Sequence, residues 1–109
     1  MPIAAYRVMW LFVLFDLPVV SKEERRDYSR FRKKVLSMGF AQLQYSVYAK
    51  HLASEEAGEH VKTHIAGALP PGGQVRLLAV TDHQFGKMEI YQGRMRCAAE
   101  SPPVQISLF

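Results

Sequence analysis

The sequence predicts an α+β domain in which two helices cover one face of an antiparallel sheet. Three observations support this fold class. A continuous apolar run spans Val8 to Phe15, two segments with helical periodicity begin at serine residues, and short alternating or apolar runs stand between and after them. At 109 residues, of which 49% are hydrophobic, the chain can build the core of one domain.

The apolar run predicts a buried strand, because it is short and is followed by Asp16-Leu17-Pro18. Ser21 and Glu24 form a capping-box pattern, which predicts that a helix begins there. The buried stripe of this helix is expected to contain Tyr28, Phe31, Val35 and Met38, with Gly39 as its C-terminal stop.

Residues 42–50 predict a second strand with one wetter face. Ser54 then begins a second helix, and the glycines and prolines of residues 70–73 predict a loop. On the strand, one face is expected to carry Leu43, Tyr45 and Val47, and the wetter face Gln44, Ser46 and Tyr48. The buried side of the helix is expected to carry Ala57, Val61, Ile65 and Ala68.

The rest of the chain predicts a strand over 74–82, a short strand over 87–93, a loose connector over 94–103 and a terminal strand over 104–109. We interpret the whole as a ferredoxin-like β-α-β-β-α-β domain with an extra C-terminal strand. Residues 1–92 would form the core domain, and residues 93–109 a connector and a strand that docks on a partner subunit. Trp10, Phe12 and Tyr48 are expected on the open face of the sheet, which a two-fold homodimer would bury.

The cysteine count and the length of the apolar run indicate where in the cell the protein is expected. Cys97 is the only cysteine, so no disulfide can form within the chain, and a reducing cytoplasm is expected. The apolar run of residues 8–15 is far shorter than the roughly 20 residues that span a bilayer, and no small-residue cleavage site follows it. We therefore expect a soluble protein with no membrane partner.

The formal net charge of +4 is carried by one segment, Lys22 to Lys34, in which seven basic residues outnumber three acidic ones. A solvated helix face with Glu23–Arg26 and Asp27–Arg30 pairs is the ordinary interpretation. The alternative is a binding surface for the phosphates of a nucleic acid. The expected nucleic-acid-binding residues are Arg25, Arg26, Arg30, Arg32, Lys33 and Lys34.

Asp16 has two interpretations. It could bond backbone amides in the turn before Pro18. It could also be the metal ligand and catalytic residue of a phosphodiesterase, because Mg²⁺ prefers one or two carboxylates together with water and phosphate oxygens. One carboxylate per chain makes a poor site, whereas two brought together across a two-fold axis would make a better one.

Two further patterns are possible signs of function, and neither predicts a functional site. His60 and His64 are four residues apart on the second helix, a spacing that can place two imidazoles on one metal, but no third ligand is evident and the H-E-x-x-H pattern is absent. An RNA-recognition motif shares the predicted element order, yet residues 74–81 contain none of the aromatic side chains with which that module stacks bases.

Taken together, "VLFDLP", "RFRKKVLSMGFAQLQYSVYAK", "VRLLAVTDHQF" and "MEIYQG" resemble the CRISPR-associated Cas2 family over about residues 8–92. The resemblance implies a ferredoxin-like homodimer whose C-terminal strand packs on the partner. It also implies one Mg²⁺ per dimer, held between the two Asp16 side chains. Family members are described as metal-dependent endonucleases acting on RNA or duplex DNA. They also serve as the DNA-binding spacer beside an integrase subunit during CRISPR spacer acquisition.

The resemblance has two departures. Gln42 stands where some nuclease-proficient relatives have arginine or lysine, and Tyr48 corresponds to their strand-end phenylalanine. The sequence therefore leaves open whether the protein is an enzyme or a scaffold that clamps duplex DNA. The expected nucleic-acid partner is duplex DNA, with single-stranded RNA as a second candidate. A ribonuclease toxin of the same fold and a non-catalytic nucleic-acid-binding or interaction module are the alternatives.

Overall fold

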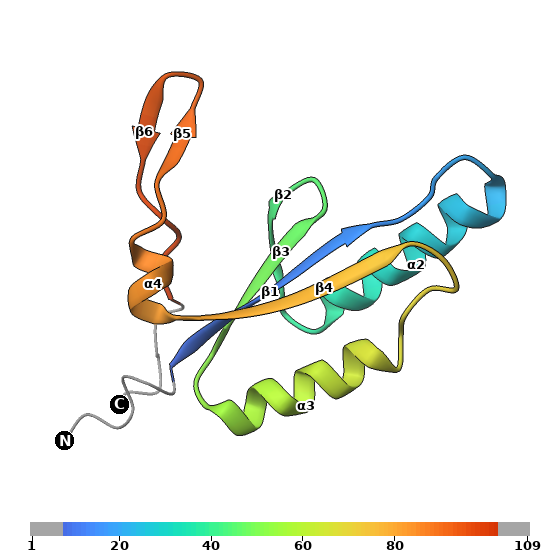
Figure 1. The fold of residues 1–109 in the computed structure, drawn as a ribbon, viewed down its shortest axis with the longest axis horizontal. Helices are drawn as coiled ribbons and strands as arrows, with labels where there is room; N and C mark the ends of the chain where they lie inside the picture. Colours follow the sequence, from blue (N-terminus) through green and yellow to red (C-terminus); the bar gives the residue numbers. More distant parts are fainter. Residues whose placement is uncertain (1–7, 103–109) are drawn as a thin grey trace.

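The structure, a computed structural model, describes residues 8–102. Its elements follow one another as β1 (Met9–Asp16), α2 (Lys22–Ser37), β2 (Ala41–Gln44), β3 (Val47–Leu52), α3 (Glu55–Ala66), β4 (Gln74–Thr81), α4 (Asp82–Gly86), β5 (Ile90–Gln92) and β6 (Met95–Cys97). The first four strands form one sheet in the order β2-β3-β1-β4, in which every neighbouring pair is antiparallel. This is the predicted ferredoxin-like β-α-β-β-α-β fold, with α2 and α3 on one face of the sheet (Figure 1). The individually predicted segments ran β-α-β-α-β-β, and the fold has the expected order because the segment predicted as one strand supplies both β2 and β3.

The main core lies between the sheet and the two helices. Side chains at alternate positions of β1 point into it, and Phe31 and Val35 of α2 and Ile65 of α3 meet them there. Burying one such side chain stabilises the fold by roughly 1.5–3 kcal/mol. The members of this cluster are Leu11, Val13, Phe15, Leu17, Phe31, Val35, Phe40, Tyr48, Leu52 and Ile65.

Both predicted helix starts are confirmed. The Ser21 hydroxyl accepts a bond from the Glu24 amide at 3.0 Å, and the Glu24 carboxylate accepts one from the Ser21 amide at 2.8 Å. These reciprocal bonds form the capping box of α2. Ser54 caps α3 in the simpler way, by accepting from the Ala57 amide. Gly39, with φ +91°, follows the end of α2 in a conformation that favours glycine.

The prediction of one strand over residues 42–50 is wrong. This segment is a hairpin, in which β2 and β3 are joined by a turn at Tyr45 and Ser46, with an irregularity in pairing between Gln42 and Gln44. Tyr48 pairs with Val13 of β1 and lies, like Val13, on the helix-covered face, whereas Leu43 and Val47 lie on the opposite face. Tyr48, predicted on the open face, is therefore fully buried in the core beneath the helices, where its ring stacks on Phe15.

The chain beyond β4 also differs from the prediction. Thr81 caps a short helix, α4, that was expected to be strand and loop. Residues 90–92 pair with residues 95–97 in a separate two-stranded hairpin, so the segment beyond residue 94 is only partly a loose connector. The hairpin stands apart from the main sheet (Figure 1). The expected terminal strand, residues 104–109, lies outside the described residues.

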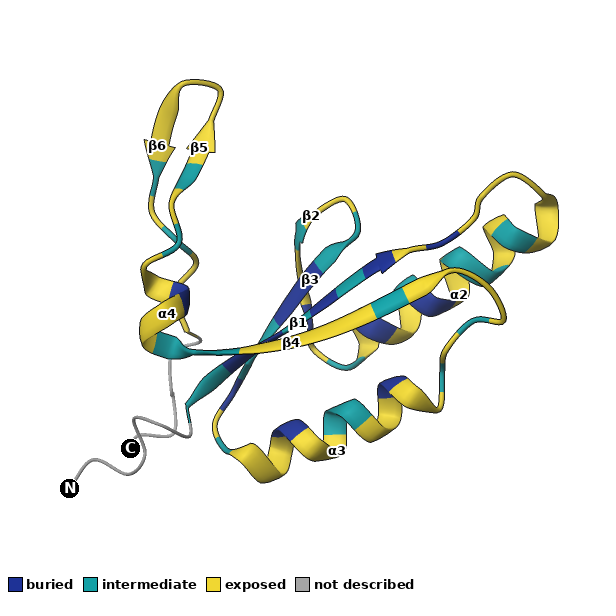
Figure 2. Ribbon diagram, in the orientation of Figure 1, coloured by how far each residue is buried: buried dark blue, intermediate teal, exposed yellow. Residues whose placement is uncertain are grey.

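The face of the sheet opposite the helices is covered at one end. The Phe85 ring of α4 stacks on Trp10 at a centroid distance of 3.9 Å, and the Trp10 indole donates to Asp82 at 2.8 Å. Trp10, expected on an open face, is therefore only 5% exposed within the chain itself. Towards Asp16 the same face is more open, because Leu78, which pairs with Phe12, is 53% exposed. Figure 2 shows how much of β4 is exposed.

Candidate functional site

Asp16 is the last residue of β1, and it is exposed although the strand before it is mostly buried. Two contacts fix this end of the strand. The Phe15 amide donates to the Ser46 carbonyl at 3.1 Å, and Asp16 is paired with Gln74 of β4. The hydrophobic strand therefore holds a carboxylate at the edge of the core, in contact with water.

The turn after Asp16 does not depend on the Asp16 carboxylate. The amides of Val20 and Ser21 instead donate to Glu24, at 3.1 and 2.8 Å. Because Glu24 forms these bonds in its charged form, with the Ser21 amide contributing most, the pKa of its carboxyl lies below its usual value. The two ion pairs found within residues 8–102 join His51 to Asp82 and Lys62 to Glu59, so neither involves Asp16. The turn interpretation of Asp16 therefore has no hydrogen bond to support it among the described residues.

Asp16 opens onto a shallow hollow of about 250 Å³. Its basic residue is Arg76, which sequence reasoning missed. Arg76 lies opposite Leu14 on β4, and its Nε donates to the Gln74 side chain at 2.8 Å. This bond orients the guanidinium and leaves its terminal nitrogens for an anion. The hollow is lined by Leu14, Phe15, Asp16, Ser46, Val47, Gln74 and Arg76.

The six predicted basic residues all lie on α2, and none of them lines the Asp16 hollow. Arg26, Arg30 and Lys33 are spaced i, i+4 and i+7, and all three are exposed, so they form one stripe along the helix, the α2 basic stripe. Lys34 is exposed as well. In a single chain, the helix that carries this stripe packs on the face of the sheet opposite the open face (Figure 1).

Two of the predicted residues are engaged elsewhere. Arg25 donates from Nη1 to the Val20 carbonyl at 2.6 Å, which braces the turn before α2. Arg32 is half-buried and makes a long contact of 3.4 Å with the Gln42 side chain. The expected Glu23–Arg26 and Asp27–Arg30 ion pairs are not among those formed by the described residues. The acidic residues of α2 therefore leave the basic stripe uncompensated by close pairing.

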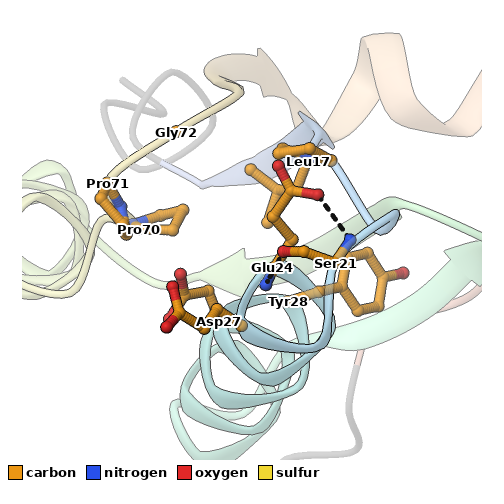
Figure 3. A pocket seen from close by; sticks show the side chains of 10 residues that line it. Leu17, Ser21, Glu24, Asp27, Tyr28, Pro70, Pro71 and Gly72 are labelled. Atoms are coloured by element: carbon orange, nitrogen blue, oxygen red, sulfur yellow. Dashed lines mark hydrogen bonds between the residues drawn. The ribbon is translucent and has the colours of Figure 1, made fainter.

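The acidic residues of α2 instead gather at its N-terminal end. Figure 3 shows Glu24 and Asp27 there beside the Pro70-Pro71 loop. With Glu23 they line a hollow of about 340 Å³ whose other walls are proline, leucine and tyrosine side chains. Like charges at this end repel phosphate. A nucleic acid lying on α2 would therefore contact its middle and C-terminal turns.

The hollow beside Asp16 offers few ligands to Mg²⁺. Asp16 is the single carboxylate among the described residues that line the hollow. Within residues 8–102, no group of three or more His, Cys, Asp or Glu side chains is placed to hold a metal ion. An exposed carboxylate still fits Mg²⁺, which keeps several waters and binds through one or two carboxylates and substrate phosphates.

Gln42 and Tyr48, the two departures from the family pattern, lie on β2 and β3. Gln42 lies on β2, where its amide donates to the Tyr45 carbonyl at 3.2 Å across the hairpin turn. Tyr48 is fully buried, and its hydroxyl has no partner among the described residues. Tyr45, an exposed residue of this turn, has a pKa above its usual value because its side chain hydrogen-bonds with Tyr28. Neither Gln42 nor Tyr48 lines the Asp16 hollow.

No helix within residues 8–102 has the length and apolar character needed to cross a membrane.

Comparison with known families identifies one match. The model of the family described as "CRISPR associated protein Cas2" matches residues 9–88, which span the sheet, both long helices, α4 and Asp16.

Individual relatives match over nearly the whole chain. A protein of Parvibaculum lavamentivorans is 44% identical over 102 residues, covering 93% of this chain and 100% of the relative. Proteins of Flavobacterium psychrophilum and Paracidovorax avenae are 39% and 37% identical, covering 95% and 98% of this chain and 90% and 99% of the relatives. All three bear the name CRISPR-associated endoribonuclease Cas2.

Proposed function

Since the chain belongs to the family of CRISPR-associated Cas2 proteins, we propose that it binds nucleic acid and hydrolyses phosphodiester bonds with Mg²⁺ at Asp16. The observation that carries this proposal is the exposed Asp16 carboxylate at the end of a buried strand, in one hollow with Arg76. Names of relatives, which include endoribonuclease, favour RNA as a substrate.

Four of the residues that line the hollow have separate parts in this proposal. Asp16 would hold the metal ion, and Arg76, oriented by Gln74, would bind a phosphate oxygen of the substrate. When bound, Mg²⁺ supplies Lewis-acid stabilisation of the charge that develops at phosphorus and activates water for attack. The polar Ser46 and Gln74 side chains keep the hollow wet, as a hydrated cation requires.

We further propose that the protein acts as a homodimer. One exposed carboxylate is a weak Mg²⁺ site, and a second Asp16 from a partner would complete it. The uncovered part of the sheet around Leu78 adjoins the hollow on the same face, so packing two such faces together would bury apolar surface and bring both hollows to the interface.

A second function rests on a different observation. The α2 basic stripe lies on the opposite side of the sheet from Asp16, so it can contact phosphates without presenting them to the carboxylate. We propose that this surface contacts duplex DNA during CRISPR spacer acquisition, beside an integrase subunit. In this role the dimer would clamp DNA whether or not it cleaves.

Cleavage assays test the catalytic proposal. Labelled single-stranded RNA and duplex DNA are incubated with the full chain in Mg²⁺ or in chelator. Wild type is expected to cut at least one polymer in Mg²⁺, and Asp16→Asn to lose roughly 100-fold or more of that rate. Asp27→Asn is the matched control, because it removes a carboxylate from the acidic end of α2 and should leave the rate unchanged.

The outcomes separate the two functions. Equal cutting by wild type and Asp16→Asn would refute the assigned site. No cutting by either protein, with salt-sensitive retention of duplex DNA, would refute the catalytic proposal and support the clamp. Absence of both cutting and binding would refute both proposals.

A further inference from the structure

We propose that His60 and His64 of α3 form a two-imidazole site for a borderline transition-metal ion, namely Cu²⁺, Ni²⁺ or Zn²⁺. The site is separate from the one proposed at Asp16, because α3 packs on the face of the sheet opposite the open face, and neither histidine lines the Asp16 hollow. Its ligand chemistry also differs, since imidazole nitrogen suits these metals, whereas Mg²⁺ prefers oxygen.

The helix fixes the geometry. Residues i and i+4 lie one above the other on a helix face, and both histidines are exposed while Ile65 beside them anchors α3 in the core. Their Nε2 atoms lie 3.1 Å apart, with the rings inclined at 68°. The two Nε2 atoms are therefore adjacent, close enough for one to donate a hydrogen bond to the other.

This separation fits a chelate. Two imidazole nitrogens on a tetrahedral zinc ion, each about 2.05 Å from the metal, are about 3.3 Å apart. In the square-planar arrangement that Cu²⁺ and Ni²⁺ favour, the same bond length gives about 2.9 Å. The observed 3.1 Å lies between these values. The spacing of the two nitrogens therefore already matches that of a chelate, and rotation of the two exposed rings would turn both lone pairs towards one ion.

The surroundings favour a cation. Helix α3 carries three glutamates, Glu55, Glu56 and Glu59, against one lysine, Lys62, and that lysine is paired with Glu59 at 3.2 Å. His64 lies in the last turn, where the helix dipole favours positive charge. Within residues 8–102 no third His, Cys, Asp or Glu joins the pair. Water would complete the coordination of a bound metal.

The test is metal binding by the untagged full chain, with Cu²⁺, Ni²⁺ or Zn²⁺ titrated into the protein in a calorimeter in the presence of excess Mg²⁺. Wild type should bind through one site that Mg²⁺ does not compete for. His60→Ala and His64→Ala should each weaken binding roughly tenfold or more, because either change leaves a single imidazole. His83→Ala removes an exposed histidine from α4 and should change nothing.

Thermal unfolding supplies a second readout. Both histidines are exposed, so the variants should melt like wild type without metal, and Ni²⁺ should raise the melting temperature of wild type only. Wild-type-like binding by both single variants, or an equal loss in His83→Ala, would overturn the proposal. Neither outcome of the metal-binding test changes what is expected of cleavage at Asp16, so the two proposals are tested independently.

Discussion

Among single residues, Gly73 sets the position of Asp16 most directly. Its φ of +84° is one that glycine adopts freely, and a Cβ there would lie 2.6 Å from the Asp16 carbonyl oxygen and 2.9 Å from Leu17 Cα. Backbone atoms cannot move aside as a flexible side chain can. We expect Gly73→Ala to lower the free energy of unfolding by about 1–3 kcal/mol, measured by urea denaturation.

Gly72→Ala is the control for this prediction. At Gly72 the nearest atom to an added Cβ is Pro18 Cγ at 3.8 Å, an ordinary contact, and φ is not positive. Its stability should stay within about 0.5 kcal/mol of wild type. If the two alanine variants were equally stable, the close approach of the loop to Asp16 would not constrain the site.

At the same scale, some site residues could be predicted from sequence and others could not. The position of Asp16 at a strand end is confirmed, because an apolar run that stops at a carboxylate and a proline is a local signal. Arg76 was missed because its place beside Asp16 depends on the register of β1 with β4, which local sequence does not encode. The face of Tyr48 was wrong because the more polar side of its strand was taken as the open one, whereas the pairing of Tyr48 with Val13 places it in the core.

Among the elements, helix α2 is stabilised by its capping box, and the size of this stabilisation should vary with pH. The Ser21 amide bond is the largest cause of the lowered pKa of Glu24, from an ordinary value of 4.5. Since the folded pKa lies below the unfolded one, Glu24 contributes stability above pH 4.5 that is lost as pH falls through the folded value. Glu24→Gln should therefore be less stable than wild type at neutral pH.

The difference should shrink steadily below pH 4.5 and vanish once Glu24 is protonated in both states. Urea denaturation at a series of pH values measures it. Glu23→Gln changes a neighbouring carboxylate in the same helical turn that takes no part in the capping box, and it should show no such dependence. A pH-independent difference for Glu24→Gln would contradict the assigned charge-assisted bonds.

Element starts were predictable wherever the capping chemistry was local. The same signal was present but unused at α4, where Thr81 and Gln84 form a second capping box. The hairpin of β2 and β3 was not recognised because Tyr45-Ser46 lacks the glycine or asparagine typical of a tight hairpin turn. In the fold, this turn is fixed by a long-range contact, the bond from the Phe15 amide to the Ser46 carbonyl.

For the whole molecule, the sheet separates two kinds of chemistry. One face carries Asp16 and Arg76 beside exposed apolar surface, and the helices on the other carry the α2 basic stripe. The sequence could show that the charge surplus sits on one helix, but not that the helix and Asp16 lie on opposite sides of the sheet, which only the packing of α2 decides. Nucleic-acid binding and cleavage should therefore respond to different substitutions.

Salt dependence of duplex binding measures the contribution of the stripe. Arg26→Gln, Arg30→Gln and Lys33→Gln combined should weaken binding and reduce the slope of log K against log salt by roughly 2–3, since each lost phosphate contact lowers it by about 0.9. All three side chains are exposed, so thermal stability should be retained.

The matched control removes the same charge elsewhere, with Lys62→Gln, Lys87→Gln and Arg94→Gln combined. These residues are spread over α3 and the segment beyond β4 and form no stripe. If net charge alone governed binding, both triple variants would lose the same slope, because long-range attraction depends on total charge. A loss confined to the α2 variant would mean that phosphates lie along that helix, on the face away from Asp16, where binding can proceed without cleavage.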